Sequence, residues 1–180
     1  MGLANPVMFN YLNKNLTKLK KNIILHNIAL SDSEGDAKLK IPIRKKSLFK
    51  SNFEDYYEGG LATIENDNKL HNKMFDTFDV KKLTLDNFNF DHKINFIKID
   101  VEGHELSVLK GSEKILKKYK PILLIEIDKQ HSTKVKETFN YLKELNYQSF
   151  YFDGIDLIKI LSYEENTRKD VKNFIFKYKE

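Results

Sequence analysis

Apolar residues recur along the chain with two spacings, which predict an alternation of helices and strands. Apolar positions three or four residues apart favour a helix, and continuous or alternating apolar runs favour a strand. In chain order the spacings predict a helix over residues 6–20, strands over 22–30, 37–43 and 94–99, a helix over 103–119, a strand over 122–127, a helix over 132–145, and strands over 147–152 and 173–178.

Asparagine, proline and glycine residues help to place the helix, strand and loop boundaries in the first half of the chain. Asn5 followed by Pro6 is typical of a helix N-terminus, because asparagine caps a helix and proline fits its first turn. Pro42 cannot donate a ladder hydrogen bond, so we expect the strand over residues 37–43 to lie at a sheet edge. Residues 44–72 lose all periodicity and contain a Gly-Gly pair, which predicts a long loop.

The second half predicts a parallel unit followed by a hairpin. The strands over 94–99 and 122–127 are almost continuously apolar and are joined by a helix, as expected for parallel strands covered on both faces. Asp153-Gly154 favours a tight two-residue hairpin turn. We therefore expect a single α/β domain over residues 1–180, with a mostly parallel sheet and an antiparallel C-terminal hairpin.

Composition narrows the class of protein by exclusion. The absence of cysteine excludes disulfides and thiolate chemistry. No apolar run approaches the ~18 residues of a membrane span, so we expect a cytoplasmic protein. The net charge is +5, but all of the 31 basic residues except Arg44 and Arg168 are lysines, interleaved with acids along the chain. This pattern is typical of solvated helix faces, and nucleic-acid binding is not expected.

One segment concentrates candidate chemistry. The glycines lack the spacing of a dinucleotide or phosphate loop, and no zinc-protease, calcium-loop or nucleophile-elbow motif is present. Asp100, Glu102 and His104 follow the strand over 94–99, where ligands of α/β sheets bind, and Glu126 ends the next strand. Histidine is the side chain best suited to exchange a proton at physiological pH, so His104 is a candidate general base. Glu126 is the only polar residue of its apolar strand, which favours a functional role.

A structural interpretation of the same segment stays open. Gly103 can serve the turn, Asp100 or Glu102 can cap the following helix, Glu105 suits its first turn, and His104 can be a solvated loop residue. The remaining histidines are isolated in sequence, and we expect structural or surface roles for them: His26, His71, His92 and His131.

The stretch NFIKIDVEGHELSVLKGSEKILKKYKPILLIEI resembles the FkbM-type family of S-adenosylmethionine-dependent methyltransferases. That family has an IDVEG-x-E-x-x-VLKG pattern, then a proline and an apolar strand ending in Glu. The segments NPVMFNYLNKNL, NIILHNIALSDSEGDAKLKIP, GGLATI and NFIFKYKE resemble other parts of the family pattern. The resemblance therefore extends over essentially the whole chain.

This resemblance implies a Rossmann-like class I methyltransferase fold that uses S-adenosylmethionine, most often to methylate the oxygen of a sugar or similar hydroxyl. It implies cofactor contacts at Ala29, Leu30, Ser31 and Asp100. Under this resemblance, the base that removes the acceptor's proton is His104 or Asp100. Glu102 and Glu126 are expected to orient the acceptor or to assist through a metal. No metal ligand set is assigned.

The family pattern also has two elements upstream of NPVMF, a first strand with a glycine-containing loop and a second strand ending in an acid. We expect the sheet to lack the first one or two strands. Three explanations are open: the true start of the protein lies upstream, a second chain supplies the strands, or the chain is a degenerate fragment. The chain alone is then expected to bind the cofactor weakly or not at all, and to be marginally stable or to self-associate. The alternative function is a non-catalytic α/β binding module or a degenerate fragment.

Overall fold

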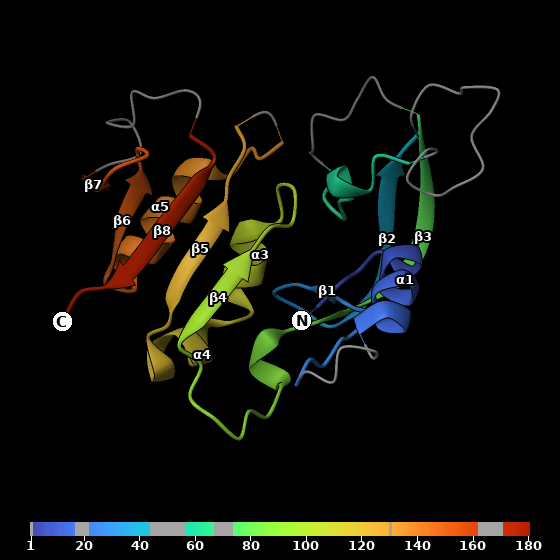
Figure 1. Cartoon of the computed structure of the whole chain (residues 1–180), viewed down its shortest axis with the longest axis horizontal. Coiled ribbons are helices and arrows are strands. Elements are labelled where there is room, and N and C mark those ends of the chain that lie inside the picture. Colours follow the sequence, from blue (N-terminus) through green and yellow to red (C-terminus); the bar gives the residue numbers. More distant parts are fainter. Residues whose placement is uncertain (1, 17–21, 44–56, 67–73, 130, 162–170) are drawn as a thin grey trace.

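The computed structural model describes residues 2–16, 22–43, 57–66, 74–129, 131–161 and 171–180, and it places them in two sheets. A three-stranded sheet and a five-stranded sheet lie side by side, each with its own apolar core (Figure 1).

The three-stranded sheet has the order β1-β3-β2. Strand β1 (Ala29–Leu30) runs parallel to β3 (Phe75–Leu83), and β2 (Gly35–Pro42) runs antiparallel to it. The position of β2 at the edge and the helix N-terminus at Asn5 are confirmed. Helix α1 (Pro6–Leu16) is capped by Asn5 Oδ1, which accepts hydrogen bonds from the backbone N–H groups of the second and third helical residues at 3.1 and 3.2 Å.

Two expectations for this half were wrong. The strand predicted over 22–30 is reduced to β1, because this segment has a ladder partner only where it reaches β3. Before that point His26 makes an isolated bridge with Gly2, and Ile24 is 71% exposed. Strand β3 was not predicted at all. Of the predicted loop, residues 44–56 and 67–72 lie outside the described residues, and η2 (Gly59–Leu61) is a single 3₁₀ turn.

The five-stranded sheet has the order β4-β5-β8-β6-β7. Strands β4 (Phe96–Ile99) and β5 (Ile122–Glu126) are adjacent and parallel, which confirms the predicted unit. The remaining pairs involve β6 (Tyr147–Phe152), β7 (Leu157–Ile160) and β8 (Asn173–Tyr178), and all are antiparallel. The mostly parallel sheet is therefore wrong for the described strands, because β8 inserts between β5 and β6 and runs against both.

The hairpin between β6 and β7 is confirmed, but its loop has four residues rather than two. Phe152 pairs with Leu157, so residues 153–156 form the loop. The side chain of Asp153 accepts hydrogen bonds from the N–H groups of Ile155 and Asp156, both at 2.8 Å. This side-chain acceptor stabilises the wider turn.

The single helix predicted over 103–119 is two helices, α3 (Glu105–Lys110) and α4 (Glu113–Tyr119). The break falls at Gly111, which touches the backbone of the loop after β1. A Cβ atom at Gly111 would lie 1.9 Å from the carbonyl oxygen of Ser31. Glycine is required by this close approach, which ties the five-stranded half to the three-stranded half.

Helices α3, α4 and α5 (Val135–Glu144) cover one face of the five-stranded sheet (Figure 1). Leu123, Ile125, Phe174 and Phe176 form the core on that face and are at most 1% exposed. On the other face, alternate strand positions are only half-buried or exposed within the described residues. Coverage of both faces, expected from the apolar continuity of the strands, is thus not found in the described chain. None of the described helices combines the length and apolarity needed to cross a membrane.

Candidate functional site

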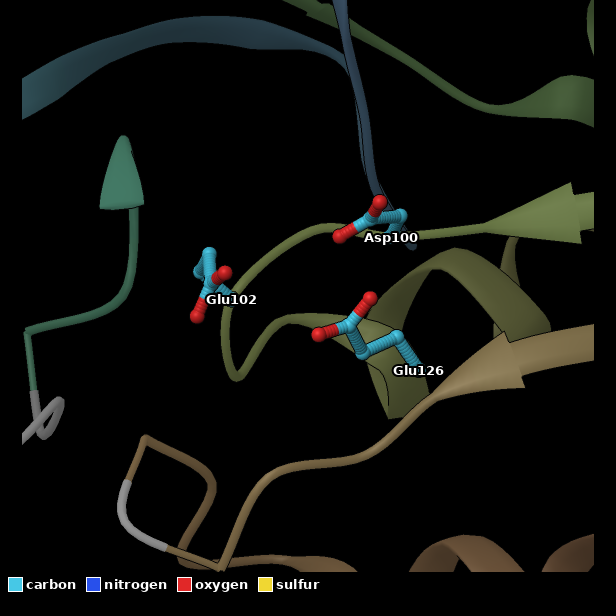
Figure 2. Close-up of side chains that lie close together, drawn as sticks. All are labelled: Asp100, Glu102 and Glu126. Atoms are coloured by element: carbon cyan, nitrogen blue, oxygen red, sulfur yellow. The ribbon is translucent and has the colours of Figure 1, made fainter. Parts of the chain in front are cut away.

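Three carboxylates gather at the carboxyl end of the β4–β5 pair, and we call Asp100, Glu102 and Glu126 the acidic rim. Asp100 follows β4 directly and Glu126 is the last residue of β5, so the parallel strands bring both to one end of the sheet. Glu102 lies in the loop after β4 (Figure 2). One oxygen from each carboxylate lies within 4.8 Å of the others.

The loop that carries Glu102 has an unusual backbone. Glu102 has φ 47° and Gly103 has φ 96°, a left-handed pair that is costly for a residue with a side chain. Two hydrogen bonds hold this conformation. The Thr63 hydroxyl donates to the Glu102 carbonyl at 2.8 Å, and the Gly103 N–H donates to Glu105 Oε1 at 2.7 Å. Strained backbone that persists in this way is common at functional sites.

Burial raises the pKa of Glu102, and the neighbouring charges of Asp100 and Glu126 raise it further. A hydrogen bond with His131 opposes this effect. Asp100 is more exposed and forms an ion pair with Lys98 at 2.5 Å. The surroundings of Glu102 therefore favour its protonated form.

His104 lines the same pocket but does not belong to the rim. Its Nδ1 lies 2.7 Å from Glu65 Oε1 and its Nε2 lies 2.9 Å from Ser31 Oγ, and its side chain is 11% exposed. The hydrogen bond with His104 lowers the pKa of Glu65. Both ring nitrogens are thus engaged in joining the loops that follow β1 and η2 to the start of α3.

His131, expected to be structural or a surface residue, contacts the rim directly. Its Nδ1 is hydrogen-bonded to Glu102 Oε2, and its side chain is 19% exposed. His131 follows the strand that carries Glu126, so both the strand end and the turn after it lie beside the rim. The place of His131 in the turn just after Glu126 is the feature from which its contact with the rim could have been predicted.

A pocket of about 260 Å³ opens beside the rim, between the two sheets. Asp100, Glu102 and His104 form one wall. The other lining residues come from the start of the chain, β1, β2 and the η2 segment, and they include Asn5, Ala29, Leu30, Leu39, Gly60, Ala62 and Thr63. Ser31 lies outside the lining residues and contacts His104 instead.

Asn5 lines this pocket and carries a buried donor without a partner in the described residues. Its Oδ1 is used by the α1 cap, whereas its Nδ2 has no hydrogen-bond partner in the described residues although Asn5 is only 4% exposed. A buried donor without a partner costs free energy, so a ligand that accepts from it would gain affinity. Sequence reasoning used Asn5 only as a helix cap.

The acidic rim has a spacing that one divalent cation could bridge. Close carboxylates are common without an ion, and no further observation in the described residues points to one. We therefore assign no metal to the rim.

Fold and site together define an α/β domain with a pocket and an acidic rim at the carboxyl ends of two parallel strands. The family model for the Methyltransferase FkbM domain matches residues 4–149, and the chain belongs to this family. Comparison with solved structures finds a methyltransferase FkbM from Methylobacillus flagellatus KT, with a TM-score of 0.56 and 18% sequence identity. The match covers 98% of this chain and 35% of that chain, and at this identity it bears on the fold alone. The search of curated proteins finds no matching relative.

Proposed function

We propose that this chain is an S-adenosylmethionine-dependent methyltransferase domain that methylates the oxygen of a sugar or similar hydroxyl. The observation that carries the proposal is the shared wall of the pocket and the acidic rim, since Asp100 and Glu102 belong to both. In a chain of the FkbM family, a pocket for the methyl donor beside a rim for the acceptor would place the two reactants together.

The pocket residues fit such a cofactor. Ala29, Leu30, Leu39 and Ala62 provide an apolar lining suited to an adenine ring, and Asn5 Nδ2 offers an unused donor. Asp100 and Glu102 place negative charge in the pocket wall, where it favours a cation. When bound, S-adenosylmethionine supplies an electrophilic methyl group on a positively charged sulfur.

We infer that Glu102 receives the acceptor's proton. His104 has both ring nitrogens engaged, and Asp100 is paired with Lys98. Glu102 lines the pocket, and burial raises the pKa of its carboxyl, which makes it a better proton acceptor than an exposed glutamate. In the proposed transfer the acceptor oxygen bonds to the methyl carbon while the carbon–sulfur bond breaks, its electrons stay on sulfur, and the hydroxyl proton passes to Glu102.

Transfer of a labelled methyl group tests the proposal. The chain is incubated with methyl-labelled S-adenosylmethionine and a panel of methyl glycosides, and labelled glycoside is counted. We expect incorporation by the wild type and a loss of about 100-fold or more in Glu102→Gln, with a much smaller loss of cofactor affinity because Asp100 remains in the pocket wall. Binding without incorporation by the wild type would favour a non-catalytic binding module, and no binding would contradict the proposed function.

A further inference from the structure

We propose that His131 is a positioning residue that orients Glu102 and keeps its carboxyl ionised for the transfer. The inference rests on the proposed function, because it assigns a role within the same reaction. It stands on the direct contact between His131 Nδ1 and Glu102 Oε2 and on the separate anchoring of the two segments that bring these atoms together.

The turn that carries His131 is anchored to the five-stranded sheet. The His131 N–H donates to the Asp128 carbonyl at 2.9 Å, and the Asp128 carboxylate pairs with Lys172 at 2.6 Å. The backbone of Lys172 also accepts a hydrogen bond from the Ile127 N–H at 2.7 Å. Lys172 precedes β8, so the turn after β5 is held by the neighbouring strand.

The loop that carries Glu102 is anchored from another direction. The Thr63 hydroxyl, beside the pocket, holds the Glu102 carbonyl, and the left-handed φ of Glu102 persists under that restraint. The Glu102 and His131 side chains are 13% and 19% exposed, so water competes only weakly for their hydrogen bond. The fold therefore brings an imidazole and a carboxylate together from two independently fixed segments.

The carboxylates near Glu102 and its contact with His131 act on its pKa in opposite directions. Two other carboxylates, Asp100 and Glu126, disfavour the ionised form of Glu102, and Glu102 in turn raises the pKa of Glu105. Among the described lysines, Lys98 pairs with Asp100 and Lys172 pairs with Asp128. His131 Nδ1 is hydrogen-bonded to the Glu102 carboxylate, and this contact favours the ionised form of Glu102. Without His131, Glu102 would hold its proton to a higher pH.

Three variants separate positioning from a purely structural role. His131→Ala removes the ring nitrogen that contacts Glu102. His131→Asn keeps an amide N–H near the position of Nδ1 but removes the imidazole. His92→Ala is the matched control, because His92 is exposed in the turn before β4. Circular dichroism establishes that each variant is folded.

Two readouts test the proposal, the pH profile of kcat/KM with a methyl glycoside as acceptor and an NMR titration of the Glu102 carboxyl carbon. We expect the acid limb of the profile and the titration midpoint to move to higher pH in His131→Ala, and less in His131→Asn. At neutral pH we expect kcat to fall about tenfold in His131→Ala while the KM for S-adenosylmethionine stays within about twofold. His92→Ala should match the wild type.

The outcomes distinguish this inference from the proposed function. If the wild type transfers methyl groups and His131→Ala keeps its pH profile and titration midpoint, the role of His131 is wrong and the proposed function stands. If the wild type neither binds S-adenosylmethionine nor transfers from it, both are overturned. A titration midpoint that is the same in the wild type and His131→Ala contradicts the role of His131 even without activity data.

Discussion

Glu102 and Glu105 are neighbouring buried carboxylates whose partners differ. Glu102 has His131, whereas Glu105 accepts a hydrogen bond from the Gly103 N–H with Oε1 and leaves Oε2 without a partner in the described residues. Glu105 is 1% exposed, and burial raises the pKa of its carboxyl. A glutamate thus belongs to the candidate site at position 102, whereas at position 105 its buried charge opposes folding.

Replacing Glu105 with glutamine is expected to stabilise the protein. Because the pKa of Glu105 is higher in the folded chain than in the unfolded chain, folding binds protons, and stability falls as pH rises from the unfolded pKa through the folded pKa. Glutamine keeps the acceptor for Gly103 and removes the charge. Urea unfolding of Glu105→Gln should show a gain of about 1 kcal/mol at neutral pH that shrinks in acid.

Glu113→Gln is the control for this prediction. Glu113 lies on the surface of α4, and its hydrogen bond with Lys117 lowers the pKa of its carboxyl, so its charge favours folding. This variant should not gain stability at neutral pH. A Glu105→Gln protein with the stability of the wild type at every pH would contradict the assignment of an unfavourable buried charge.

Asn5 is expected to have two separable roles. Asn5→Ala loses the α1 cap and should lower the free energy of unfolding by about 1 kcal/mol, whereas Asn5→Ser keeps a cap and should cost little. Both variants lose Nδ2, so calorimetric titration should show weaker cofactor binding in both. Equal affinity of Asn5→Ser and the wild type would remove Asn5 from the cofactor site.

At the level of elements, the break between α3 and α4 is caused by a tertiary contact of Gly111 with the Ser31 backbone, and not by a local sequence preference. Gly111→Ala would place a methyl group against the Ser31 backbone, which cannot move without shifting the loop after β1. We expect a loss of about 3 kcal/mol or more in the free energy of unfolding, measured by urea denaturation. Gly60→Ala is the matched control, since a methyl group at Gly60 would meet no atom within 4 Å and should leave stability nearly unchanged.

Local patterns predicted the elements that depend on local chemistry. The β4–β5 pair follows from its continuous apolar runs, the cap of α1 from Asn5-Pro6, and the edge position of β2 from Pro42. The helix break, by contrast, depends on a loop about 80 residues earlier in the chain. The position of β8 between β5 and β6 depends on which strands pair in the folded sheet. Such tertiary choices leave no periodic signal in the sequence.

The candidate site was predictable to a similar degree. Asp100 and Glu126 come together because adjacent parallel strands end at one edge, which is a rule of the fold. The engagement of His104 by Glu65 and Ser31 joins three distant segments, and the contact of His131 with Glu102 depends on the path of a turn. Neither could be derived from spacing alone.

For the molecule as a whole, an open apolar edge predicts self-association. Within the described chain β4 pairs only with β5, and Phe96 and Ile122, opposite each other on these strands, are 56% and 44% exposed. Edge strands with exposed apolar side chains pair with other copies. Light scattering after size exclusion should show concentration-dependent association that Phe96→Lys reduces. Tyr11→Lys, on the exposed surface of α1, should not.

A chain that remains monomeric at every concentration would contradict this prediction. So would equal association of the wild type and Phe96→Lys, because the edge of β4 would then not be the surface involved.

The central claim is that the pocket between the two sheets holds the methyl donor. Its most direct test is an amide NMR titration of the wild-type chain with S-adenosylmethionine to about 1 mM, which also detects weak binding. We expect shifts at Asn5, Ala29, Leu30 and Glu102, with a weaker response in Asn5→Ser. No shift at these residues, or shifts confined to the strands far from the acidic rim, would contradict it.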